Sequence, residues 1–191
     1  MNKKDRIIQA AVDVFYEKGI EKTKISDITQ AAGIAQGTFY LYFPSKLALM
    51  PSIAEKIVAN LMTTIKENID ENASFEQQIK QIIDTVFYFV KEHRTIYAFI
   101  YTGLSQTEHL KEWDTIYLPF YQWMSDFLKK HQTSGKVNSD IPLQRLSSLV
   151  INLVESTAEQ MYLYNYTNEE NIELQKEALI SFLNNALNVK N

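Results

Sequence analysis

The residues between positions 36 and 46 carry polar groups whose types and spacing suit binding to nucleic acid. This segment holds an amide, a hydroxyl, two phenols and an ammonium group, on Gln36, Thr38, Tyr40, Tyr42 and Lys46. All of these groups can donate hydrogen bonds, and none carries a negative charge that would repel phosphate. A short helix with this outward face suits a DNA groove better than bulk water.

A pair of helices around a tight turn would position these groups. Ile28 and Ala32 lie on one face of a first helix, and Gly33 supplies the left-handed conformation in which many helices end. In the helix that follows, Phe39 and Phe43 are spaced i, i+4 and therefore share the face that points to the core. The polar residues of the segment then project away from the core.

A further helix before this pair would complete a three-helix head. Residues 3–18 have an amphipathic pattern that stops at Gly19. The residues from Thr23 to Ser26 include candidate caps for the next helix. Lys24 and Ser26 could reach a phosphate from that position.

The rest of the chain repeats helical patterns and shows no strand signal of useful length. Expected helices cover residues 45–68, 74–92, 96–104, 108–130, 142–161 and 168–187. Ser74 and Gln77 form a capping box, and Asp140 is a candidate cap before Pro142. The sequence predicts an all-α protein of about nine helices, with a three-helix head at 1–46 and a larger helical domain at 47–191.

Charge is unevenly distributed along the chain. The net charge is −4, but residues 1–50 hold seven basic and five acidic side chains, so the acidic excess lies in the remainder. The mildly basic end is the one that would face phosphate. Cysteine is absent, no signal peptide is recognisable, and no apolar run approaches the ~18 residues of a membrane span. We expect a soluble, cytoplasmic protein with no membrane partner.

Residues that could support catalysis or metal binding are scarce. The three histidines, His93, His109 and His131, are widely spaced. His109 and Glu112 stand at i, i+3 and could share a metal, although a lone pair of this kind is far more often solvated. No Gly-x-Ser-x-Gly elbow and no Gly-rich phosphate loop occurs. We therefore expect no enzyme activity, no cofactor and no metal.

The first quarter of the chain resembles the TetR family of bacterial transcriptional regulators. One departure is Thr29, where the family usually has alanine, and a threonine methyl group can pack much as alanine does. The positions that fall at the family's spacing are Ile8, Ala11, Phe15, Gly19, Thr23, Ile25, Ile28, Ala32, Gly33, Ile34, Gly37, Phe39, Tyr40, Tyr42, Phe43, Lys46 and Leu49.

The resemblance implies a helix-turn-helix DNA-binding domain at 1–46 and an effector-binding and dimerisation domain at 47–191. It also implies roles for individual residues of the head. Base edges would be approached by Gln36, Gly37 and Thr38. Phosphates would be held by Tyr40, Tyr42 and Lys46, with support from Thr23, Lys24 and Ser26. The alternative for the two tyrosines is packing between head helices, and for the lysine it is simple solvation.

Aromatic residues cluster in the middle of the chain, where twelve of the 23 lie between positions 86 and 127. Ordinary core packing is one interpretation, and a cavity for a flat or greasy molecule is the other. The resemblance favours a cavity, because TetR-like proteins bind effectors in this part of the chain. The candidate ligand-binding residues are Phe99, Tyr101, Trp113, Tyr117 and Tyr121. Glu155 is either solvated, paired at an interface, or a buried partner for a cationic ligand.

The last two helices carry more apolar surface than one packed face requires, as Leu149, Val150, Leu153 and Val154 show. Members of the resembled family dimerise through two C-terminal helices, here residues 142–188. A two-fold dimer would set two recognition helices about 34–36 Å apart on a pseudo-palindromic operator.

The sequence thus predicts a homodimeric, ligand-responsive DNA-binding regulator. The expected form is a repressor that releases its operator when it binds a hydrophobic or aromatic small molecule, although the same sequence could serve an activator. The alternatives are a helical protein that binds lipids or small molecules and acts through a protein partner, and an all-α enzyme without a recognisable catalytic group.

Overall fold

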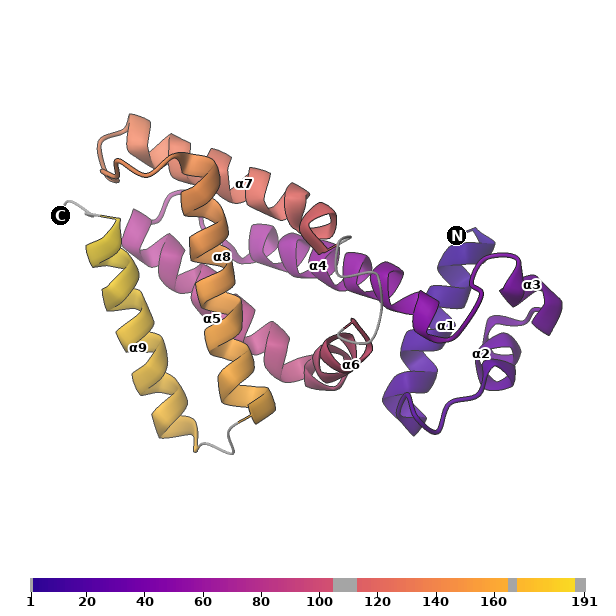
Figure 1. Ribbon diagram of the computed structural model, residues 1–191. Helices are drawn as coiled ribbons and strands as arrows, with labels where there is room; N and C mark the ends of the chain where they lie inside the picture. Colours follow the sequence, from indigo (N-terminus) through magenta and orange to yellow (C-terminus); the bar gives the residue numbers. More distant parts are fainter. Residues whose placement is uncertain (1, 105–112, 165–167, 188–191) are drawn as a thin grey trace. The chain divides into compact units, whose positions relative to one another are not determined.

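The computed structural model describes residues 2–104, 113–164 and 168–187, and Figure 1 shows its helices. Within these ranges it has nine α-helices and no strand. The predicted all-α fold of about nine helices is therefore confirmed. None of the helices in these ranges is both long enough and apolar enough to cross a membrane.

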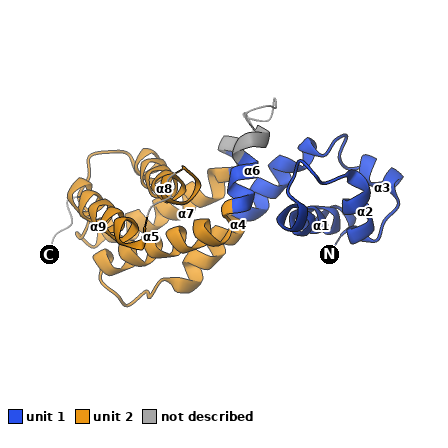
Figure 2. Cartoon of the chain, turned by 90° about the horizontal axis from the view of Figure 1, so that it is seen from below, with its two compact units in different colours: residues 1–57, 95–116 blue, residues 58–94, 117–191 orange. Residues whose placement is uncertain are grey.

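The chain packs into two compact units, which Figure 2 shows in different colours. The first unit consists of residues 1–57 and 95–116, and the second of residues 58–94 and 117–191. The first unit is thus larger than the predicted head of residues 1–46, because the start of one long helix and a later helix pack with it.

The first unit contains the three helices expected of the head, namely α1 (Lys3–Lys18), α2 (Ile25–Ala32) and α3 (Gln36–Tyr40). The Asn2 side chain caps α1 by accepting a hydrogen bond from the Asp5 N–H at 2.9 Å, and the helix stops at Gly19, whose φ is +76°. The buried side chains of the three helices include Ile7, Ile8, Ala11, Phe15, Ile28, Ala32 and Phe39.

The predicted long helix from Ser45 begins differently from expectation. A short 3₁₀ turn, Leu47–Leu49, precedes α4 (Met50–Asn68), and the Ser45 hydroxyl accepts a hydrogen bond from the Ala48 N–H at 3.2 Å. Tight turns of this kind are common at helix ends. Helix α6 (Arg94–Leu104) joins the first unit through its later residues, and the Phe99 ring meets the Phe15 ring edge-on at 6.1 Å.

The second unit is built around α5 (Phe75–Glu92), against which α8 (Leu143–Glu159) and α9 (Glu169–Ala186) both pack (Figure 1). The second unit also contains the later part of α4, most of α7 (Trp113–Thr133) and a π-helical turn at Gln160–Tyr164. The predicted capping box of α5 is confirmed, because Ser74 and Gln77 exchange hydrogen bonds at 3.0 and 3.3 Å.

Two expected helix starts need comment. Residues 105–112 lie outside the described residues, so the start predicted at 108 does too. Pro142 is the N-cap residue of α8 rather than its first helical residue, and no side chain caps that end. The capping role predicted for Asp140 is therefore wrong, because Pro142, whose φ and ψ are −53° and 132°, occupies the N-cap position instead.

Candidate nucleic-acid interface

The turn between α2 and α3 depends on Gly33. Its φ and ψ are +61° and +43°, the left-handed conformation that the sequence predicts. Its N–H donates to the Gln30 carbonyl at 3.1 Å, and the next N–H, of Ile34, donates to the Thr29 carbonyl at 3.0 Å. A Cβ atom at Gly33 would lie 3.2 Å from Nη2 of Arg6. Both the conformation and the close approach therefore favour glycine.

Two phenylalanines fix the orientation of α3. Phe39 and Phe43 are 0% and 4% exposed, and their ring centroids lie 5.9 Å apart. The Phe43 N–H donates to the Phe39 carbonyl at 3.0 Å, so helical hydrogen bonding continues one turn beyond Tyr40. Because this pair is held in the core, the remaining faces of the segment must point outward.

The outward face holds the residues predicted to meet DNA. Gln36 and Gly37 are exposed, Thr38 is half-buried, and Tyr40 and Tyr42 are 50% and 42% exposed. The Tyr40 ring also touches the buried Phe39 ring edge-on at 5.6 Å. Neither tyrosine is enclosed by the protein, which leaves both phenol groups accessible to a partner.

Leu41 is absent from the residues predicted for the interface, yet it is 82% exposed. It lies between the two exposed tyrosines, so it belongs to the same surface. The sequence signal that could have identified it is its spacing, two residues from both Phe39 and Phe43, which at helical periodicity places it opposite the buried face. An aliphatic side chain at such a position can contact a thymine methyl group.

Thr23 and Lys46 both make contacts within the protein that the sequence does not indicate. The Thr23 side chain is buried and donates to the Gly19 carbonyl at 2.7 Å. The Lys46 ammonium donates to the carbonyl oxygens of Ile20 and Thr23, the latter at 2.8 Å. A buried hydroxyl group cannot reach a phosphate, so Thr23 is a structural residue of the loop. Lys46 is neither free nor merely solvated, because it binds the protein's own backbone.

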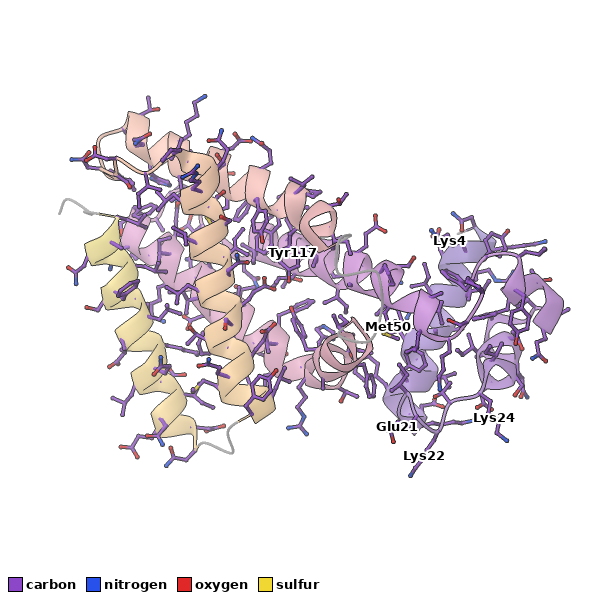
Figure 3. All side chains as sticks on the ribbon, viewed as in Figure 1. Lys4, Glu21, Lys22, Lys24, Met50 and Tyr117 are labelled. Carbon is purple, nitrogen blue, oxygen red and sulfur yellow. The ribbon has the colours of Figure 1, made fainter. Side chains whose placement is uncertain are left out.

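Lys24 and Ser26 are exposed at the start of α2, where the sequence analysis places them. Figure 3 shows Lys22 and Lys24 extending outward from the same end of the head. The Lys24 N–H donates to Oδ2 of Asp27 at 2.9 Å, and the Lys18 ammonium lies 3.1 Å from Oδ1 of Asp27. The Lys24 N–H, followed by Lys18, lowers the pKa of the Asp27 carboxyl group below its ordinary value.

The candidate ligand-binding residues do not all fall in one unit. Phe99 belongs to the first unit, whereas Tyr117 and Tyr121 lie together on α7 in the second, with ring centroids 5.6 Å apart. The side chains of Tyr101 and Trp113 lie outside the part of the structure that is described. Of the three candidates whose side chains are described, the structure therefore brings together Tyr117 and Tyr121.

A line of polar contacts joins α7 to α8. The buried Tyr117 hydroxyl donates to Oε1 of Glu155 at 3.2 Å, and the Tyr121 hydroxyl donates to Oδ1 of Asn152 at 3.0 Å. Glu155 is only 4% exposed, which rules out the solvated alternative of the three considered from the sequence. Its tyrosine partner lies 38 residues away in the chain, which sequence spacing alone could not indicate.

Among the described residues, no cluster of three or more His, Cys, Asp or Glu side chains is arranged to hold a metal ion. His109 and Glu112, the one pair considered from the sequence, lie outside those residues. No conclusion about that pair follows.

Family descriptions match both parts of the chain. Residues 7–53 match the bacterial regulatory proteins of the tetR family, and residues 79–187 match the tetracyclin repressor-like C-terminal domain. The chain is also 38% identical over 185 residues to the uncharacterized HTH-type transcriptional regulator YvdT of Bacillus subtilis, covering 97% of this chain and 95% of that protein.

Solved structures show the same fold. FadR of Thermus thermophilus, a TetR-family repressor solved in complex with lauroyl-CoA, has a TM-score of 0.76 and 18% identity, covering 98% of this chain and 96% of that one. FadR of Bacillus subtilis, solved with stearoyl-CoA, has a TM-score of 0.73 and 20% identity over 95% and 97% of the two chains. The chain therefore belongs to the TetR family and is a DNA-binding transcriptional regulator rather than an enzyme.

Proposed function

We propose that the chain is a homodimeric repressor that releases its operator when a hydrophobic effector binds. The observation that carries this proposal is the surface of α3, where polar side chains stand outward around the buried pair of Phe39 and Phe43. In this proposal Gln36, Gly37 and Thr38 approach base edges. The phosphates are contacted by Tyr40, Tyr42, Lys24 and Ser26.

The dimer is supported by exposed apolar side chains on the last two helices. On α8, Leu149 and Leu153 are 57% and 36% exposed, although Val150 and Val154 already provide a buried face. On α9 the exposed residues include Leu174 and Phe182, at 57% and 60%. Large apolar side chains that repeat along exposed helix faces mark interaction surfaces. We assign this surface to a second copy of the chain, with the two copies reading a pseudo-palindromic site.

An acyl-CoA thioester is the effector class that we propose to test first. Two proteins of the same fold have been solved with lauroyl-CoA and stearoyl-CoA. A long acyl chain is also a greasy ligand of the kind that the aromatic-rich middle of the chain would accept. The effector acts by population shift, because it can release DNA only through its greater affinity for the state that does not fit the operator.

Operator binding is tested by gel shift with the full-length protein, using the DNA upstream of its own gene against a scrambled duplex of the same length. We expect retardation of the upstream duplex at concentrations that leave the scrambled one free. Acyl-CoA of several chain lengths is then added, with free CoA and the matching fatty acid as controls. Equal retardation of both duplexes would reject operator recognition, and release by none of the ligands would reject the effector class alone.

Substitutions separate base contacts from phosphate contacts. Gln36→Ala should relax discrimination at one base pair by about 1–3 kcal/mol, whereas Lys24→Ala should weaken binding to all sequences alike and reduce the salt slope by about one. If Gln36→Ala lowers affinity equally for operator and scrambled DNA, its assignment to a base is wrong.

The dimer surface is tested by Leu149→Glu and Phe182→Glu, which place a charge on each exposed apolar face. Light scattering should show a monomer, and operator affinity should fall because the two heads are no longer linked. Leu118→Glu on α7 is the matched control, since Leu118 is 58% exposed but lies outside α8 and α9. A charged variant that still forms the dimer would place the interface elsewhere. A protein that binds acyl-CoA but no DNA would favour the alternative, a helical carrier that acts through a protein partner.

A further inference from the structure

Two basic side chains bind backbone carbonyl groups on either side of α2. Before the helix, the Lys46 ammonium donates to the carbonyl oxygens of Ile20 and Thr23. At the end of the helix, Nη2 of Arg6 donates to the carbonyl oxygen of Ala32 at 2.5 Å. The donors come from the segment before α4 and from α1, so the loop that leads into α2 and the last residue of α2 are both connected to other elements of the first unit.

The carbonyl groups at these two places are favourable acceptors for a positively charged donor. Ala32 is the last residue of α2, where carbonyl groups lack partners within the helix and the helix dipole is negative. In the loop before α2, the hydrogen bond from Thr23 to the Gly19 carbonyl closes residues 19–23 into a tight turn. The ammonium group of Lys46 reaches two carbonyl oxygens of this turn at once, which uses two of its three donors.

Other lysines of the same region are placed differently. Lys22 and Lys24 are exposed and extend outward from the head (Figure 3). Among the described hydrogen bonds and ion pairs, neither ammonium group is assigned to a carbonyl oxygen of this loop. Lys46 therefore differs from Lys22 and Lys24 in the hydrogen bonds that its ammonium group makes, not in its charge.

The connection through Lys46 also involves the start of α4. Lys46 directly precedes the 3₁₀ turn Leu47–Leu49, and the buried Leu49 and Met50 hold that turn and the first residue of α4 in the first unit. The loop that leads into α2 is thus hydrogen-bonded to the segment that leads into α4. Because α3 follows α2 through the turn at Gly33, the orientation of α3 depends on this loop.

We propose that Lys46 and Arg6 are positioning residues for DNA recognition. They hold α2, and through it α3, in the arrangement that fits the groove, and phosphate neutralisation falls to exposed lysines such as Lys24. This inference rests on the proposed DNA-binding function. It differs from the phosphate contact expected of Lys46 from the sequence, and the two can be told apart by experiment.

The test compares Lys46→Met and Arg6→Met with Lys22→Met, a control that removes one positive charge from the loop before α2 and disturbs neither the Lys46 nor the Arg6 hydrogen bonds. Affinities for operator and scrambled duplexes are measured over a salt series with the full-length protein. We expect the two positioning variants to lose about tenfold in the ratio of operator to scrambled affinity. Their salt slopes should match that of Lys22→Met.

Hydrogen exchange of the free protein gives a second measurement. Loss of a phosphate contact alone would not change exchange rates in the absence of DNA. Backbone amides of residues 20–28 should exchange faster in Lys46→Met, and those of residues 30–36 faster in Arg6→Met, with both regions unchanged in Lys22→Met. If a methionine variant does not fold, Lys46→Gln or Arg6→Gln replaces it, because the glutamine amide can still donate a hydrogen bond and should give a smaller change of the same kind.

Two results would overturn the proposal. One is an equal loss on both duplexes with a salt slope reduced by about one beyond the control, which is the behaviour of a phosphate contact. The other is unchanged exchange in both regions. If the wild type itself does not distinguish operator from scrambled DNA, the proposed function fails, while the exchange data still decide whether these side chains hold α2.

Discussion

The head formed by α1–α3 and the helical unit formed around α5 place their polar side chains in opposite ways. In the head, apolar rings such as Phe39 lie inside and the groups available for binding lie outside, with Tyr40 and Tyr42 about half exposed. In the helical unit, Tyr117 and Glu155 are buried and bound to each other. A surface that reads DNA must be accessible before its partner arrives, whereas buried polar groups in a helical core mainly fix which side chains face one another.

The difference predicts what substitutions will do in each region. Removing an outward group of the head should change binding and leave stability nearly intact. Removing a buried group of either region should change stability first, in proportion to how completely the group is enclosed. The four predictions below test this distinction.

The largest effect is expected from Phe39→Ala in the head. The Phe39 side chain is fully buried, so its removal leaves a cavity and should lower the free energy of unfolding of the head by about 3–5 kcal/mol. Chemical denaturation followed by circular dichroism measures this loss, and DNA binding should disappear with it. Tyr40→Phe is the control, because the exposed ring keeps its packing. A stable Phe39→Ala protein would mean that the head does not depend on this core.

The next effect is expected in the helical unit, from Tyr117→Phe. The variant removes a buried hydrogen-bond donor to Glu155, which should lower the free energy of unfolding by about 1–3 kcal/mol. Tyr121→Phe on the same helix is the matched control, since its hydroxyl donates to the exposed Asn152 and should matter less. Urea unfolding of both variants, with Glu155→Gln added as a double-mutant cycle, measures the coupling. If Tyr121→Phe lost more free energy of unfolding than Tyr117→Phe, burial would not decide which hydroxyl group matters for stability.

Acid should destabilise the helical unit through His131. Burial, followed by the charges of Lys130 and Lys136, lowers the pKa of this imidazole below its ordinary value of about 6.5. The unfolded chain then binds the proton more readily, so the free energy of unfolding should fall as the pH drops through 6.5 towards the lowered pKa. Burial also lowers the pKa of His93, which adds a contribution of the same sign.

The measurement is urea unfolding at several pH values between about 7 and 5 for the wild type and for His131→Gln. The Gln78 amide donates to the carbonyl oxygens of Asp70 and Ala73 at 2.9 and 3.2 Å, so its oxygen is left to accept from Nε2–H of the neutral His131 at 2.9 Å. The variant should show a shallower pH dependence. If the free energy of unfolding changed with pH equally in both proteins, His131 would not be a source of the acid destabilisation.

The smallest effect is expected from Asp27→Asn at the start of α2. The Lys24 N–H lowers the pKa of the Asp27 carboxyl group, so the charged form stabilises the folded head at neutral pH. This contribution is present above the ordinary carboxyl pKa and is lost as the pH falls through the lowered pKa. Thermal melts at pH 7 should rank the variant slightly below the wild type, and the gap should close in acid. If the difference in melting temperature between variant and wild type widened in acid, the charged Asp27 carboxylate would not be the stabilising form.

Much of the head can be predicted from the sequence because its signals are local. Gly33 marks the turn, and Phe39 and Phe43 mark the buried face of α3, through residues only a few positions apart. The hydrogen bonds from Lys46 and Arg6 join atoms 23 to 26 residues apart, so no local pattern indicates them. The same applies to Tyr117 and Glu155, 38 residues apart. Periodicity identifies which residues are buried, but it does not identify which buried polar groups meet.

The exposure of Leu41 bears on the thermodynamics of operator binding. Its side chain is 82% exposed directly after α3, and DNA that covers this surface must remove it from water. Burying that surface contributes a negative heat capacity change, which titration calorimetry at several temperatures can measure. Ions screen phosphate contacts but not this contribution. At ionic strengths that abolish binding to unrelated DNA, the operator complex should therefore retain part of its affinity.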